Sequence, residues 1–238
     1  MANKFDINNS DTDYNMASEK DMMGSVFSTM LPMLLLTFLY SGCISVAPES
    51  IAGEKERGTI TTMLVTPMKR SSLAMGKIAA LAIIALLSGL SSTIGTIASM
   101  PSLMGSDTSD MNANVYGVAE YALLGITIMS TVIFLITIIS IISAFAKSVK
   151  EAQTAVSPLM IIVVVVGISA MFASGAKEGV AYYLIPLYNS VQAMVGIFSF
   201  EIVPMNIMVA FISNIVYSLV GVFVLTKMFN SEKIMFSR

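Results

Sequence analysis

Long stretches without a charged residue dominate the chain. They cover residues 22–48, 78–106, 121–146, 152–176, 180–200 and 202–226. A helix needs about 20 apolar residues to cross a hydrocarbon core about 30 Å thick, because each residue adds about 1.5 Å. Backbone amides in lipid must bond within their own segment, so even the β-branched run 161–166 is predicted to be helical. Five membrane-spanning helices are predicted, near residues 25–47, 78–100, 121–146, 153–175 and 203–226.

The remaining stretch, 180–200, is predicted to be an outer re-entrant helical hairpin. Pro186, Asn189 and Gln192 lie in its middle, where a proline and polar side chains make a lipid-facing span costly. Only Glu201 separates it from the next stretch, which leaves too little chain for two full spans to turn in water. Two interpretations of the three central residues stay open: they form an outer gate, or they only kink the hairpin.

Lysine and arginine predict how the spans are oriented. With five spans, ten basic residues fall on one side and three on the other. Basic residues are retained in the cytoplasm, so the richer side is expected inside. The segments expected inside are 49–77, 147–151 and 227–238, and those expected outside are 1–24, 101–120 and 177–201. A sixth full span would move the last three basic residues outside, which supports the hairpin.

The amino-acid composition limits the catalytic and metal-binding chemistry that the protein can carry out. Of 238 residues, 55% are hydrophobic and 12% are charged, about half the charged fraction of a soluble domain. The absence of histidine removes the commonest general base and metal ligand, and the single Cys43 allows no internal disulfide. A net charge of −2 gives no argument for nucleic-acid binding. The sequence therefore predicts an all-α polytopic membrane protein with little catalytic chemistry.

Several alternative functions lack the residues they need. No carboxylate lies at mid-span depth, which disfavours a secondary antiporter. An intramembrane protease needs paired acids or a catalytic Ser–His pair, and the spans supply neither. The 20 methionines are scattered, so they indicate flexible packing rather than Cu(I) binding.

The cytoplasmic segment 49–77 is the only densely charged part of the sequence. Glu54, Lys55, Glu56 and Arg57 would occupy successive positions around one helical turn, and Pro67 can end that helix. A short amphipathic cytoplasmic helix is predicted. It is either a solvated loop that orients the protein or a docking element whose mixed charges suit a groove on a soluble partner.

Two motifs carry a family resemblance. The stretch ESIAGEKERGTITTMLVTPMKRSSLAMGK at 49–77 resembles ABC transporter permeases of the type-2 exporter class. Eight or more positions in this stretch carry, in the same order, the residue types of the family's motif. The stretch IPLYNSVQAMVGIFSFE at 185–201 narrows this toward the NatB-like sodium-efflux branch. The resemblance covers roughly residues 17–238. It implies six spans, dimeric membrane domains, an outer re-entrant hairpin before the last span, and a coupling helix that contacts a separate ATPase subunit.

The resemblance also implies roles for single residues. Glu54, Glu56 and Arg57 are expected to contact the ATPase, and Gly58 and Thr59 to shape the helix. The complete expected coupling set is Glu49, Glu54, Lys55, Glu56, Arg57, Gly58, Thr59, Pro67 and Arg70. The expected outer gate is Pro186, Asn189 and Gln192.

The domain organisation expected from this resemblance is an extracellular N-terminal tail, 1–24, followed by a transmembrane permease domain, 25–238. The tail has no signal peptide and would cross the membrane unaided. The family's first span and most of its extracellular domain have no counterpart here. The chain is therefore expected to act alone, to pair with a separately encoded first half, or to be an inactive fragment.

The sequence as a whole predicts the permease subunit of an ATP-driven exporter in a bacterial plasma membrane, with its N-terminus outside and its C-terminus cytoplasmic. Gly76-Lys77 lacks the other residues of a phosphate-binding loop, so ATP and Mg²⁺ are expected in the partner ATPase and no cofactor in this chain. A second permease chain and the lipid bilayer are the other expected partners. Sodium is the first expectation for the cargo, and drug, peptide or lipid export and a non-transporting scaffold are the alternatives.

Overall fold

The computed structural model describes residues 19–59, 69–103, 116–172 and 175–231, and no strand occurs among them. Five of its helices are long and apolar enough to cross a membrane. They are α1 (Glu19–Pro48), α4 (Arg70–Leu103), α5 (Val118–Phe145), α6 (Val149–Met171) and α8 (Pro204–Phe229). The prediction of an all-helical, polytopic membrane protein with five spans is confirmed.

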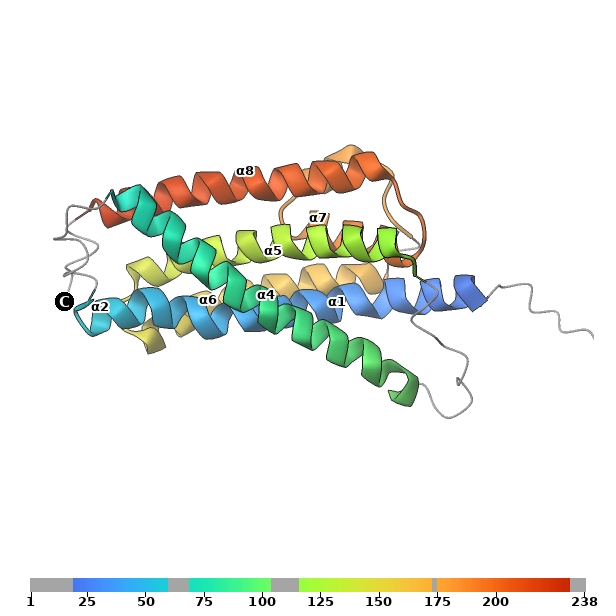
Figure 1. Cartoon of the computed structure of the whole chain (residues 1–238), viewed down its shortest axis with the longest axis horizontal. Helices are drawn as coiled ribbons and strands as arrows, with labels where there is room; N and C mark the ends of the chain where they lie inside the picture. Colours follow the sequence, from blue (N-terminus) through green and yellow to red (C-terminus); the bar gives the residue numbers. More distant parts are fainter. Residues whose placement is uncertain (1–18, 60–68, 104–115, 173–174, 232–238) are drawn as a thin grey trace, which may run out of the picture.

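The helices form one elongated bundle in which α4 crosses the others obliquely (Figure 1). Successive spans alternate in direction, so α1, α5 and α8 end at the same end of the bundle at which α4 and α6 begin. The helix ends and connections gathered there carry the basic residues Lys55, Arg57, Lys69, Lys77, Lys147, Lys150 and Lys227. We call this the basic end of the molecule.

Helix α1 lies at the centre of the bundle and packs against α4, α5, α6 and α7 (Tyr188–Phe198). Its side chains Leu35, Leu36 and Leu39 are at most 1% exposed. A small residue on a neighbouring helix allows close approach, since a Cβ at Gly167 of α6 would lie 3.2 Å from the Met33 Cα atom. Close packing of this kind is one of the sources of helix association in lipid, together with interhelical hydrogen bonds.

The first span does not end where the apolar run ends. Helix α1 continues through a single π-helical turn, η1 (Glu49–Gly53), into α2 (Glu54–Glu56). Pro48 lacks an N–H and its ring crowds the preceding turn, which favours a local widening of the helix at this point. The charged turn at Glu54 was expected to belong to a separate short helix, but in the described residues it is an extension of the first span.

The segment 180–200 enters the bundle and returns. It forms a 3₁₀ turn, η3 (Val180–Leu184), followed by α7 of 11 residues, which rises only about 16 Å and is too short to span. Figure 1 shows the segment leaving and rejoining the end of the bundle opposite the basic end. Every residue from Asn189 to Phe198 is buried, so α7 lies among the spans rather than against lipid. This is the geometry of a re-entrant hairpin.

Candidate functional site

Charged side chains gather where α1 extends beyond the apolar run. We call this set the charged junction; it comprises Glu49, Glu54, Lys55, Glu56, Arg57 and Lys77. Arg57 Nη1 donates to Glu49 Oε1 at 2.6 Å, and both side chains are more than half exposed. Lys77 Nζ of α4 donates to Glu54 Oε2 at 2.5 Å and to the Ser50 carbonyl at 3.0 Å. The Lys77 and Glu54 side chains are 9% and 20% exposed, so removing either partner would leave a largely buried charge unpaired, whereas the exposed pair contributes little.

The charged junction also holds the connection between α5 and α6. Glu56 Oε2 accepts a hydrogen bond from the Val149 N–H, the first of α6, at 3.0 Å. Lys55 Nζ donates to the Ala144 carbonyl in the last turn of α5 at 3.3 Å. An anion at a helix N-terminus and a cation at a C-terminus are both favourable. The extension of α1 is therefore tied to α4, α5 and α6 by one charged side chain each.

Small residues bring the backbones together beneath these charges. Ala52 of η1 is fully buried and packs with Ala146 and Ala152, which flank the α5–α6 connection. A Cβ at Gly53 would lie 3.1 Å from a Val149 methyl group and 3.2 Å from an Arg57 guanidinium nitrogen. The π-helical turn therefore fits against α6 without space for a larger side chain.

The end of the extension faces solvent. Glu56, Arg57, Gly58 and Thr59 are all exposed, and Gly58 ends the helix at a φ of 75°. The hydrogen bond from Arg57 to Glu49 raises the pKa of its guanidinium further above the ordinary value, so Arg57 stays charged.

An open groove of about 620 Å³ adjoins this exposed end. It lies between the extension of α1 and the start of α4, and its lining includes Glu49, Arg57, Ser72 and Lys77. The exposed end and the groove together offer an accessible, mixed-charge surface at the basic end of the molecule.

A second polar cluster lies inside the bundle, near the middle of α5 and α8. We call it the polar latch; it comprises Ser130 and Thr131 of α5, Asn189 and Ser190 of α7, and Asn214 of α8. Asn189 Nδ2 donates to Asn214 Oδ1 at 2.8 Å, and Asn214 Nδ2 donates to Ser190 Oγ at 3.0 Å and to Ser130 Oγ at 3.4 Å. Thr131 Oγ1 donates to Ser190 Oγ at 2.8 Å. All five side chains are at most 1% exposed, so the latch ties the re-entrant helix to two spans.

Comparison with known protein families matches residues 2–192 to the family described as ABC-2 family transporter protein. The chain belongs to the ABC-2 transporter family. Among curated proteins, the ABC transporter permease protein NatB of Bacillus subtilis (strain 168) is 39% identical over 64 residues, which are 27% of this chain and 17% of NatB. No solved structure matches. The resemblance seen in the sequence is confirmed at the level of the family, and the chain is an ABC transporter permease with several membrane-spanning helices.

The structure of this ABC-2 permease brings most of the expected coupling set together. Seven of its residues lie within the stretch 49–59, at the extension of α1. Arg70 begins α4. Pro67 lies outside the described residues. The partners of Glu56 and Lys55 were missed because they are backbone groups of α5 and α6, for which a sequence gives no signal.

The three residues expected at an outer gate have different surroundings in the permease. Pro186 is exposed at the turn of the hairpin, next to the buried Leu187, which has a φ of 67°. Asn189 belongs to the polar latch. Gln192 is fully buried and its Oε1 accepts from the Lys177 N–H at 3.0 Å, whereas its Nε2 has no partner among the described residues. Asn214 was not singled out, although it is one of only two asparagines in α8.

The close contact at Gly53 predicts that a substitution there destabilises the protein more than a substitution at Gly58. Gly53→Leu is expected to lower the free energy of unfolding by about 1–3 kcal/mol, because the side chain would displace Val149 and the α5–α6 connection. Gly58→Ala meets no atom within 4 Å and should cost only about 1 kcal/mol, for its positive φ. Thermal unfolding in detergent measures both. A Gly53→Leu variant as stable as Gly58→Ala would contradict the close packing of η1 on α6.

Proposed function

We propose that this permease is the membrane subunit of an ATP-driven exporter and that a separate ATPase subunit acts on it at the charged junction. The observation that carries the proposal is the set of ties from one short extension to three other spans. Glu54, Lys55 and Glu56 contact α4, α5 and α6 in turn. A displacement of the extension would therefore move four spans together.

The proposal divides the charged junction into two parts. Arg57, Gly58 and Thr59 are exposed to solvent beside the adjacent groove, and this surface is the proposed contact for the partner. Glu54 and Lys77 are largely withdrawn from solvent and paired, so they serve to transmit movement within the chain. Glu56 contributes to both, since it is exposed and also bonds to α6.

The mechanism that follows is mechanical. When ATP and Mg²⁺ bind in the partner, closure of its ATPase sites would push the extension and tilt the attached spans, biasing the permease toward a second arrangement. A second permease chain would form the other half of the pathway. Sodium is the first candidate for the cargo, from the resemblance to NatB-like permeases, with drugs, peptides and lipids as the competing classes.

The polar latch gives the hairpin a role in this mechanism. Its hydrogen bonds join α7 to α5 and α8, whose far ends lie at the basic end. Tilting those spans would break or exchange these bonds, and the hairpin would move with them. We propose Asn189 as the gate residue that holds α7 in the observed position.

Copurification tests the assignment to an exporter. The full chain, tagged at its C-terminus and extracted in mild detergent from its native membrane, is expected to bring an ABC ATPase subunit with it. The double variant Arg57→Glu/Thr59→Arg should lose the ATPase while Lys177→Glu, on the opposite end, retains it. Recovery of the intact chain without any ATPase subunit would favour a non-transporting scaffold.

The orientation is open to a labelling test, because the only native cysteine, Cys43, is fully buried. Lys177→Cys is expected to react with a membrane-impermeant maleimide in intact cells. Thr59→Cys should react only after the membrane is permeabilised, since the basic end is proposed to be cytoplasmic. If Thr59→Cys but not Lys177→Cys were labelled in intact cells, the protein would have the opposite orientation, with the basic end outside.

A further inference from the structure

The open groove of about 620 Å³ beside the charged junction changes character along its length. Its outer half, toward the basic end, contains all of its charged lining residues: Glu49, Glu54, Arg57 and Lys77. Its inner half is lined by residues from the charge-free stretches of α1 and α4: Ser45, Val46, Ala80, Leu81 and Ile84. The Ser45 hydroxyl already donates to the Gly42 carbonyl at 2.7 Å, so this half makes no further polar demand. We call this groove, polar at one end and apolar at the other, the junction groove.

The junction groove crosses the level at which the hydrocarbon core is expected to begin. The charge-free stretch of α1 ends at Pro48, and that of α4 begins at Ile78. From Lys77 to Ile84, α4 rises about 10 Å toward the middle of the bundle. A soluble subunit does not reach this depth, whereas a phospholipid carries a polar head group and an apolar chain in the same order as the groove. A phospholipid therefore matches both halves.

The charges of the outer half match a zwitterionic head group. Two of the lining residues are acidic and two are basic, so their charges sum to zero. Glu54 and Lys77 are paired and largely withdrawn from solvent. Arg57 and Glu49 are 55% and 54% exposed, and an exposed ion pair is only weakly stabilising. A head group can therefore replace this pair at little cost, with its phosphate accepting from Arg57 and its ammonium donating to Glu49.

The hydrogen-bonding capacity of Glu49 favours a primary ammonium. A carboxylate only accepts hydrogen bonds. The ammonium of phosphatidylethanolamine offers three N–H donors, whereas the choline of phosphatidylcholine carries methyl groups instead and offers none. Phosphatidylglycerol has the phosphate but no cation, so its negative charge would face Glu49 without compensation. The groove therefore favours an ethanolamine head group over both of the others.

We propose that the junction groove binds phosphatidylethanolamine, with the phosphate at Arg57, the ammonium at Glu49 and the first part of one acyl chain along Leu81 and Ile84. The lipid would bridge the extension of α1 and the start of α4 from the membrane side. The proposal goes beyond the proposed function, because it requires neither the ATPase nor a cargo and its test uses neither.

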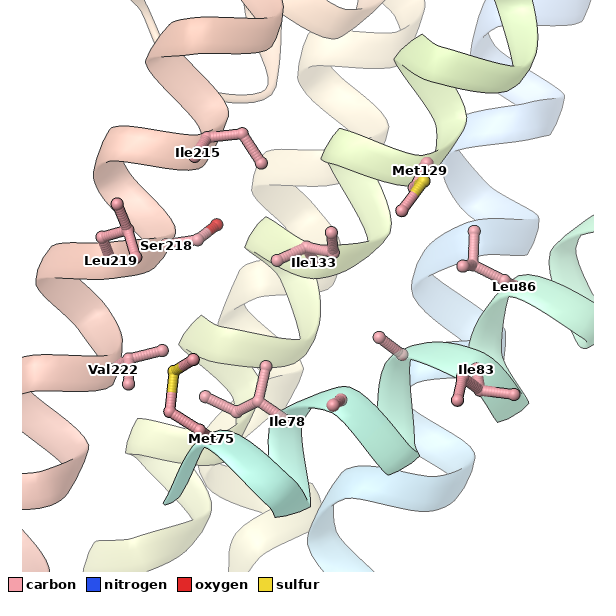
Figure 2. Close-up of a pocket in the computed structure, with 12 residues that line it drawn as sticks. Met75, Ile78, Ile83, Leu86, Met129, Ile133, Ile215, Ser218, Leu219 and Val222 are labelled. Carbon is pink, nitrogen blue, oxygen red and sulfur yellow. The ribbon is translucent and has the colours of Figure 1, made fainter. Parts of the chain in front are cut away.

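A neighbouring cavity provides a comparison without charges. Figure 2 shows this cavity of about 340 Å³ between α4 and α8, lined by apolar side chains such as Ile83 and Leu219. None of the described residues that line it is charged, and the Ser218 hydroxyl already donates to the Asn214 carbonyl at 2.7 Å. This cavity has no means of distinguishing one head group from another.

The absence of tryptophan from the chain allows a direct test by fluorescence. Ile84→Trp places a fluorophore in the apolar half of the junction groove, and Leu219→Trp places one in the comparison cavity; the two positions are 50% and 57% exposed. Each variant of the full chain is reconstituted in nanodiscs of unlabelled phosphatidylcholine with a small fraction of lipid brominated on the upper part of one acyl chain. The brominated lipid is phosphatidylethanolamine, phosphatidylcholine or phosphatidylglycerol.

Brominated phosphatidylethanolamine is expected to quench Ile84→Trp at a several-fold lower mole fraction than either other lipid, and to quench Leu219→Trp no better than they do. Adding Glu49→Gln to Ile84→Trp should abolish the preference over phosphatidylcholine. Adding Lys69→Gln should leave it unchanged, because Lys69 is exposed at the same end and is not among the described residues that line the groove.

Three results would overturn the proposal. The first is equal quenching of Ile84→Trp by phosphatidylethanolamine and phosphatidylcholine, or an ethanolamine preference that survives Glu49→Gln. The second is stronger quenching by phosphatidylglycerol, which would indicate a site for negative charge alone. The third is protection of Ile84→Trp from all three lipids, because protein would then fill the groove.

Discussion

Glu54→Lys is expected to lower the free energy of unfolding by about 3 kcal/mol, the largest effect of a single change in the charged junction. The substitution removes the partner of Lys77, a side chain that is only 9% exposed, and places a second cation beside it. Partial exposure of Glu54 keeps the cost at the lower end of the range for a broken buried pair. Thermal unfolding of the detergent-solubilised permease measures the loss.

The charge swap Glu54→Lys/Lys77→Glu separates the ion pair from other effects. It restores opposite charges at the same two positions and is expected to recover part of the lost stability, because a glutamate at position 77 cannot donate to the Ser50 carbonyl as Lys77 does. Arg57→Glu is the matched control, because its pair with Glu49 is more than half exposed and should contribute at most about 1 kcal/mol. A swapped variant no more stable than Glu54→Lys would show that the pair does not hold the extension of α1 against α4.

Asn214→Leu is expected to lower the free energy of unfolding by about 2 kcal/mol and to loosen the attachment of the re-entrant helix α7 to α8. The change removes three interhelical hydrogen bonds, each worth on average about 0.6 kcal/mol in a membrane protein. It leaves Ser190 and Asn189 with fewer partners in a buried, apolar setting. The expected signs are a lower unfolding temperature and faster proteolysis of the hairpin in reconstituted vesicles.

Two further variants make the latch test specific. Val216→Ala lies two residues along α8 at a position that is 50% exposed, and should change stability little. The double variant Asn189→Leu/Asn214→Leu should cost less than the sum of its single changes, because each amide loses its partner in either single variant. Strictly additive costs would mean that the two asparagines do not act together.

Much of the fold could be predicted from where charges are missing. The five charge-free stretches that were predicted to span each form a long helix, because lipid offers no other partner for their amides. The interruption at Pro186 and Asn189 likewise predicted that the stretch 180–200 does not span, and α7 is too short to do so. These predictions succeeded because they depend on local composition and on the thickness of a bilayer.

The interactions at the two clusters could not be predicted in the same way. Pro48 is typical of a helix boundary, yet here a π-helical turn carries the helix onward to Glu56. Val149 could not be predicted as a partner of Glu56, because it donates through its backbone N–H, a group that every residue except proline carries. Asn214 is an isolated polar residue in an apolar run, and only the packing of α8 against α7 reveals its partner Asn189.

Photo-cross-linking from Thr59 tests the central claim most directly. A photoreactive amino acid at this exposed position, in membranes that also contain the ATPase subunit, is expected to form a cross-link to that subunit. The same group at Lys177, on the opposite end of the bundle, is expected to form none. The claim that the charged junction receives the ATPase would be contradicted if Thr59 formed no cross-link while the ATPase subunit still copurified with the permease.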